Sequence, residues 1–117
     1  MVTVNVQRNE QNEIEVITMT GHANAGKHGS DLVCAAVSAV SLGLINAADL
    51  LLGKSPDVQF AEKDGGFLQW DLRRTDDDAL REKQMLLAES MVVSLFMIAE
   101  TNGKYVAVHD TKWQGGV

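Results

Sequence analysis

The sequence contains a single cysteine, so the chain cannot form an intramolecular disulfide. A lone cysteine is typical of a reducing compartment, and it leaves a thiol whose role needs an explanation. The chain also lacks an uninterrupted apolar run of membrane-spanning length, and its start, VTVNVQRNE, lacks the charged beginning and apolar core of a signal peptide. These absences predict a cytoplasmic protein that does not bind a membrane.

Positive charge is scarce as well. Lysine and arginine together number 10, against 16 aspartate and glutamate residues, which gives a formal net charge of −6. An acidic surface disfavours direct binding to nucleic acid and favours a basic peptide or protein partner. Because the chain has no internal repeat, low-complexity tract or linker, we expect a single domain over residues 1–112 and a loose C-terminal tail over residues 113–117.

Periodicity predicts the order of the elements. Alternating apolar and polar residues predict strands at about 2–8 and 13–20, and a second hairpin runs from Val58 to Leu72. Helical spacing predicts helices at about 31–52 and 77–101, and a short strand follows at 105–108. The order ββαββαβ predicts an α+β sandwich in which two main helices pack on a mostly antiparallel sheet.

The first predicted helix has two different faces. Its apolar stripe is expected to face the core and consists of Val33, Val37, Val40, Leu44, Ala48 and Leu51. A neighbouring face carries Cys34, Ser38, Ser41 and Ile45, and a substrate backbone is expected to approach this face near the helix start. The second helix is more apolar over residues 91–99 than one core-facing stripe requires, which indicates burial against a second subunit.

The segment from Thr18 to Ser38 reads TMTGHANAGKHGSDLVCAAVS and combines a histidine, a glycine-spaced loop and the cysteine. A thiol reacts as the thiolate, which a neighbouring base or the positive end of a helix dipole favours. With Ser30 or Asp31 as the helix N-cap, Cys34 would lie in the first helical turn or just beyond it. Because eleven residues separate His22 from Cys34, the loop can bring the imidazole back to the thiol. The pattern predicts a nucleophile and its base.

The residues between these two have supporting interpretations. The glycines Gly21, Gly26 and Gly29 let the loop adopt positive φ angles and let its backbone approach a peptide, so a substrate-binding or mobile loop is expected. Asp31 is assigned a supporting role, because a carboxylate beside a thiolate opposes ionisation unless it bonds the imidazole or the backbone.

Two further residues complete the predicted substrate-binding region. Ser30 ends the glycine-bearing loop, and Ser38 lies one helical turn beyond Cys34. Each also has a plainer interpretation, Ser30 as a helix cap and Ser38 as a packing residue.

Other interpretations of the same residues stay open. Cys34 can be a small buried hydrophobe, His22 a turn residue and Asp31 a plain helix cap. The spacing of His22, His28 and Cys34 also admits a metal site, to which Asp31 adds an oxygen ligand. A structural zinc site usually shows closely paired ligands such as C-x₂-C, and beyond His109 nothing later in the chain offers a clear fourth nitrogen or sulfur. No metal or cofactor is therefore predicted.

The segment GHANAGKHGSDLVCAAVS resembles the signature of the ribosomal-processing cysteine protease family, Prp, whose pattern is roughly G-H-A-x-x-G-x-x-G-x-D-x-V-C-A-A-V-S. The pattern is met by Gly21, His22, Ala23, Gly26, Gly29, Asp31, Val33, Cys34, Ala35, Ala36, Val37 and Ser38. The resemblance implies a cysteine endopeptidase that removes a short N-terminal extension from a bacterial large-subunit ribosomal protein precursor. It further implies a homodimer and no cofactor.

The resemblance also implies roles for the residues of the motif. Cys34 is then the nucleophile and His22 the general base, the loop from Gly21 to Ser30 is a mobile cover, and Asp31 is an orienting group. A different class of function stays open, in which the chain is a non-catalytic binding module for basic ribosomal protein segments and Cys34 is only packed. A redox or metal sensor is a third hypothesis.

Overall fold

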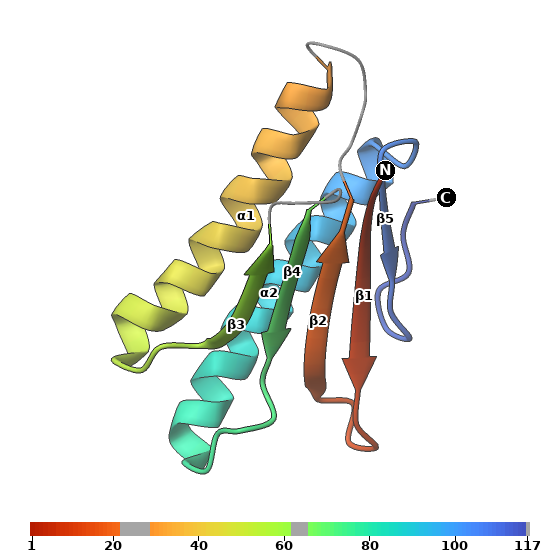
Figure 1. Ribbon diagram of the computed structural model, residues 1–117. Helices are drawn as coiled ribbons and strands as arrows, with labels where there is room; N and C mark the ends of the chain where they lie inside the picture. The colour runs from red at the N-terminus through yellow and green to blue at the C-terminus, as the bar shows by residue number, and fades with distance from the viewer. Residues whose placement is uncertain (22–28, 62–65, 117) are drawn as a thin grey trace.

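The computed structural model of the chain describes residues 1–21, 29–61 and 66–116, without the side chains of residues 29–31. Two helices lie on one face of a five-stranded sheet of order β3-β4-β2-β1-β5 (Figure 1). The elements are β1 (Val2–Arg8), β2 (Ile14–Thr20), α1 (Gly29–Leu52), β3 (Asp57–Ala61), β4 (Phe67–Asp71), α2 (Asp78–Thr101) and β5 (Val106–His109). Among the described strands only β1 and β5 pair in parallel, so the predicted α+β fold with a mostly antiparallel sheet is confirmed.

The core lies between the sheet and α2. Val4, Ile17 and Trp70 project from three adjacent strands and are completely buried, and α2 covers them with apolar residues such as Met91 and Leu95. The alternation of the strands therefore places one apolar face under the helices.

Helix α1 buries a different stripe from the predicted one. Val37 and Ala48 are buried as expected, but Leu51 is 75% exposed. Ser41 and Ile45, assigned to a neighbouring face, are buried instead. The helix packs mainly against α2, and its buried face consists of Val37, Ser41, Ile45 and Ala48.

The start of α1 also differs from the prediction. The helix begins at Gly29, so both predicted N-cap residues, Ser30 and Asp31, lie inside it. Cys34 is thus the sixth helical residue and lies in the second turn. Because the favourable dipole field is strongest within the first turn, this placement weakens the expected help from the helix terminus.

Helix α2 keeps its predicted limits. The Asp77 carboxylate caps it and accepts hydrogen bonds from the amides of Ala79 and Leu80. Most of residues 91–99 are covered within the chain itself, and Met97 is the only strongly exposed large hydrophobic residue among them. The excess apolar character of this segment is therefore largely explained without a second subunit.

Residues 113–116 are not loose, contrary to the prediction for the C-terminal tail. Gly115 exchanges two backbone hydrogen bonds with Val108 of β5, at 2.7 and 3.0 Å. The ring of Trp113 lies 5.4 Å from that of Phe96, centroid to centroid. This segment therefore extends the edge of the sheet and packs on α2.

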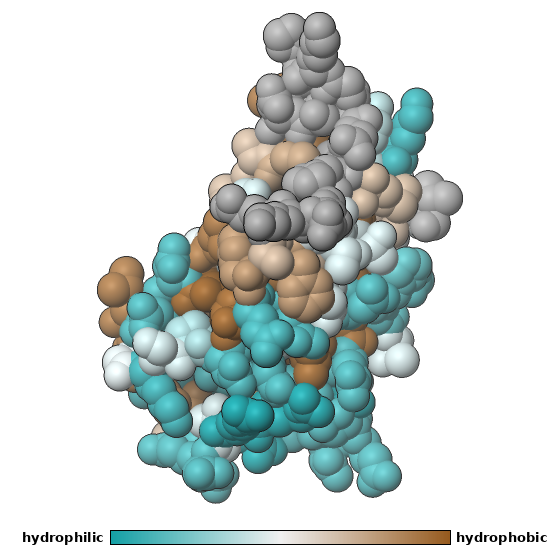
Figure 2. Space-filling model, in the orientation of Figure 1, coloured by the Kyte–Doolittle hydropathy of each residue, from teal (hydrophilic) through white to brown (hydrophobic). Residues whose placement is uncertain are grey.

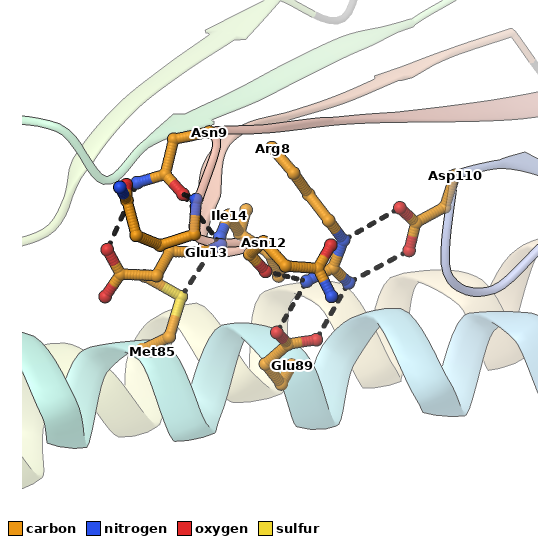
Figure 3. Close-up of polar contacts among 9 residues, drawn as sticks. Arg8, Asn9, Asn12, Glu13, Ile14, Met85, Glu89 and Asp110 are labelled. Atoms are coloured by element: carbon orange, nitrogen blue, oxygen red, sulfur yellow. Dashed lines mark hydrogen bonds and ion pairs between the residues drawn. The ribbon is translucent and has the colours of Figure 1, made fainter.

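A buried ion-pair network joins β1, α2 and the C-terminal segment. The Arg8 guanidinium donates to both oxygens of Glu89 and to both oxygens of Asp110, and also to the carbonyl oxygen of Asn12 (Figure 3). The Arg8 and Asp110 side chains are only 3% and 0% exposed. The cluster therefore holds the end of β1 to α2 and to the C-terminal segment.

Both helices are long and apolar enough to cross a membrane by length and composition alone, although the sequence was expected to hold no such run. Such helices are also found in the cores of soluble proteins. The qualifying window is 33% buried in α2 and only 17% buried in α1. The described part of the chain thus leaves a large part of the apolar α1 exposed or only half-buried (Figure 2).

Candidate functional site

A cavity of about 480 Å³ lies between the first half of α1 and the sheet. From α1 it is lined by Cys34, Val37, Ser38, Ser41 and Leu42. The sheet side and its adjoining residues contribute Val2, Met19, Thr20, Gly21, Phe60, Ala61, Gly66, Phe67 and Leu68. All described lining residues are uncharged, so the cavity suits an uncharged, mostly apolar group such as a side chain of a bound peptide.

Cys34 is half-buried and lies in the wall of this cavity. Ser38 lies one turn further along the same helix face and is exposed, so the two predicted site residues share one surface. The hydroxyl of Ser41, another turn on, donates to the carbonyl oxygen of Val37 at 2.7 Å. That hydrogen bond satisfies the buried hydroxyl and leaves its proton unavailable to a ligand.

Gly21 directly follows β2 and lies at the rim of the same cavity. Its φ angle is +88°, and a Cβ atom at this position would overlap the carbonyl oxygen of Met1. Its amide donates to the carbonyl oxygen of Gly66 at 3.2 Å, which fixes the chain to β4. The first glycine of the motif is therefore required by a close backbone approach as well as by its conformation.

Several predicted site residues cannot be placed relative to Cys34. His22 and Gly26 lie outside the described residues, as does His28 of the alternative metal site. Gly29, Ser30 and Asp31 lie in the first turn of α1, but nothing is described of their side chains. Of the predicted site residues, the structure thus brings together Gly21, Cys34 and Ser38.

The sequence reasoning missed the opposite wall of the cavity. Phe60 is 55% exposed at the edge of the sheet and lines the same cavity as Cys34 and Leu42. Its distance of 26 positions from Cys34 in the sequence concealed this juxtaposition, because a single aromatic residue in a predicted strand carries no signal of a site by itself.

Among the described residues, the charged groups with altered ionisation lie away from this cavity. The hydrogen bonds that Arg8 donates to the carboxylates of Glu89 and Asp110 raise the pKa of its guanidinium. A hydrogen bond from Arg73 is the main reason that the pKa of Asp71 falls to about 2. Neither group lines the cavity, so these shifts concern stability rather than chemistry at Cys34.

The chain is similar in sequence to known cysteine proteases. The profile of the family described as "Cysteine protease Prp" matches residues 1–107. A Bacillus subtilis protein named ribosomal processing cysteine protease Prp is 41% identical over 95 residues, which make up 81% of this chain and 84% of that protein. A protein of the same name from Staphylococcus aureus (strain Mu50) is 34% identical over 100 residues, or 86% of this chain and 90% of that protein.

Solved structures share the fold. A crystal structure of a Streptococcus mutans protein superposes with a TM-score of 0.82 at 33% identity, covering 93% of this chain and 92% of that one. The S. aureus ribosomal processing protease Prp, solved with a covalently linked product peptide, superposes with a TM-score of 0.77 at 30% identity, covering 93% and 98%. The profile match, the sequence relatives and the shared fold agree along nearly the whole chain. The chain belongs to the Prp family of cysteine proteases.

Proposed function

We propose that this chain is an endopeptidase that removes a short N-terminal extension from the precursor of a large-subunit ribosomal protein. The observation that carries the proposal is the position of Cys34 in the wall of an uncharged cavity, in a chain of the Prp cysteine protease family. Cys34 is the proposed nucleophile, and His22 is the proposed general base.

The proposed reaction follows the usual course of a cysteine protease. His22 takes the thiol proton, and the Cys34 sulfur attacks the scissile carbonyl carbon to give a tetrahedral oxyanion that nearby backbone amides stabilise. The imidazolium then gives its proton to the leaving amine, so the peptide bond breaks and a thioester remains. Water, deprotonated by His22, hydrolyses the thioester and restores the thiol. No cofactor takes part in this scheme.

Charge and cavity chemistry support this type of substrate. A chain of net charge −6 attracts a basic ribosomal protein, which raises the rate of encounter. The cavity itself presents no charged side chain among its described lining residues, so the segment cut is expected to be apolar while its flanks are basic. Such an encounter belongs in the cytoplasm, where we place the protein.

We also propose a homodimer, formed through α1 rather than through residues 91–99 of α2. Along α1 an outward stripe with helical spacing of three or four residues is exposed throughout, and it consists of Leu32, Ala36, Ala39, Gly43, Asn46 and Leu50. Leu32 and Leu50, at its two ends, are 74% and 81% exposed. The small residues between them allow a second helix to approach closely, and burial of the leucines would supply the driving force.

The direct test is cleavage of a ribosomal-protein precursor that carries its N-terminal extension, read by mass spectrometry. Wild type should cut one bond. Cys34→Ala should cut none and keep the wild-type circular dichroism spectrum, and His22→Ala should lower turnover on the order of 10²-fold or more, as loss of a positioned base does.

The outcomes separate the alternatives. Normal cleavage by Cys34→Ala would refute the assignment of Cys34 as the nucleophile. Normal turnover by His22→Ala would show that His22 is not the general base and would favour its interpretation as a turn residue. Tight binding without cleavage by any variant, under reducing conditions and with other precursors, would establish a binding module instead. Stoichiometric metal in the purified protein would support the sensor hypothesis.

A further inference from the structure

One edge of the sheet is open beside the cavity. Strand β3 pairs only with β4, and within the described residues no other segment pairs with its outer side. The opposite edge, β5, is met by Gly115 through two backbone hydrogen bonds. An open edge presents unpaired backbone N–H and C=O groups, which form a template for another strand.

The register shows which groups of β3 point outward. In an antiparallel pair, every second residue directs its backbone N–H and C=O toward the partner strand. Two hydrogen bonds, from the Leu72 amide to the Glu15 carbonyl and from the Gly21 amide to the Gly66 carbonyl, show which residues of β2 and β4 do so. The backbone groups of Leu68 and Trp70 therefore point toward β2, and those of Gln69 point toward β3.

Because Gln59 is opposite Gln69, the backbone of Gln59 pairs inward with β4. Its neighbours alternate, so the N–H and C=O groups of Val58 and Phe60 face the open edge. Of these two residues, Phe60 is the one that lines the cavity.

The open edge and Cys34 face the same space. Phe60 and Ala61 line the cavity from β3, while Cys34, Ser38 and Leu42 line it from α1. In Figure 1, β3 is the strand nearest to α1, and Figure 2 shows apolar side chains gathered over this part of the molecule. An extended peptide along β3 would therefore run between the sheet edge and the helix that carries the thiol.

We propose that the substrate binds as an added strand on the outer edge of β3, with its backbone paired to the N–H and C=O of Phe60 and one apolar side chain in the cavity. This inference rests on the proposed peptidase function and adds its mode of recognition. Backbone pairing supplies affinity that does not depend on sequence, whereas the cavity selects the side chain. Phe60 thus acts twice, through its backbone and through its ring.

An N-methyl scan of the substrate tests the pairing. Each residue around the scissile bond of the precursor peptide, except the one whose nitrogen belongs to that bond, is N-methylated in turn, which removes one N–H and leaves every side chain in place. In an added strand only alternate residues point their N–H toward β3. Methylation should therefore raise KM about 10-fold at every second position, the effect of about one lost hydrogen bond with its steric cost, and much less between them.

Two variants of Phe60 provide the matched comparison on the enzyme. Phe60→Ala removes the ring and keeps the amide, whereas Phe60→Pro removes both, and proline is tolerated on an edge strand where the N–H faces outward. The proline variant should lose a further factor of about 10 in kcat/KM beyond the alanine variant. Thermal melts show whether both variants are folded, and the methyl scan decides the question if the proline variant is not.

The possible failures are distinguishable. Cleavage of the unmodified peptide combined with a scan that shows no two-residue period would overturn the added strand and leave the peptidase function standing. No cleavage of the unmodified peptide by wild type would overturn the proposed function and this inference with it.

Discussion

At the scale of single residues, Asp110 shows how a buried charge is held. Burial raises the pKa of its carboxyl, but hydrogen bonds from Arg8 and from the amides of Lys112 and Trp113, together with the Arg8 charge, outweigh that effect. The folded-state pKa therefore lies below the ordinary value of about 3.9. Its stabilising contribution is complete above that pH and is lost as the pH falls through the folded-state pKa.

We predict that Asp110→Asn lowers the free energy of unfolding by about 2–3 kcal/mol at pH 7, because it leaves Arg8 buried with one charged partner fewer. At pH 3 or below the difference from wild type should shrink. Urea unfolding at both pH values measures it. The control is Asp71→Asn, which breaks the more exposed pair with Arg73 and should cost less than about 1 kcal/mol. Equal losses in the two variants would contradict the structural role of the network.

Gly21 provides a second prediction at this scale. Gly21→Ala should destabilise the domain by about 2 kcal/mol or more, because the new Cβ would overlap the Met1 carbonyl oxygen and the φ angle of +88° disfavours any L side chain. Thermal denaturation measures the loss. A melting temperature equal to that of wild type would show that the backbone at Gly21 adapts easily.

Some of these residue-level features could be predicted from the sequence and others could not. The cap at Asp77 was predictable because a side chain and the amides two and three residues away form a local unit. The Arg8 network was not, because Arg8 and Asp110 are 102 positions apart and meet only once the sheet has formed. Phe60 escaped notice as part of the site for the same reason.

At the scale of elements, the strands and both helices followed from periodicity, but the buried face of α1 did not. A period of 3.6 residues identifies a helix, whereas the orientation of its stripe depends on what it packs against. Packing on α2 covered Ser41 and Ile45 and left Leu51 outside. The side chains expected to complete the site with Cys34 lie outside the described part of the chain, so the dyad stays a prediction.

Helix α1 also carries a glycine that its own fold does not require. A Cβ atom at Gly43 would have no neighbour within 4 Å among the described residues. Gly43→Ala should therefore raise the free energy of unfolding by up to about 1 kcal/mol, the difference in helix propensity between the two residues. Chemical denaturation of wild type and Gly43→Ala would measure this gain, which is opposite in sign to the loss expected for Gly21→Ala. A destabilised Gly43→Ala variant would instead indicate that the second copy of α1 in the proposed dimer packs too closely on Gly43 to admit a methyl group.

At the scale of the whole molecule, the proposed dimer places α1 against α1. Gly43→Arg adds a long charged side chain to the middle of the exposed stripe, at a position where its Cβ atom would meet no described atom within 4 Å. It should convert a dimer to the 12.7 kDa monomer in sedimentation at micromolar concentration, while Gly43→Ala stays dimeric. A wild type that sediments only as the monomer would refute the interface.

The partly covered edge at β5 has a consequence for how copies of this protein meet in a crowded cell. Growth of a sheet from molecule to molecule needs two open edges on each copy, one to receive and one to pass on. Gly115 occupies part of one edge, so among the described strands only β3 remains fully open. A strand that pairs with β3 therefore leaves only the partly covered β5 edge on the other side of the sheet, which hinders growth of the sheet from one copy to the next.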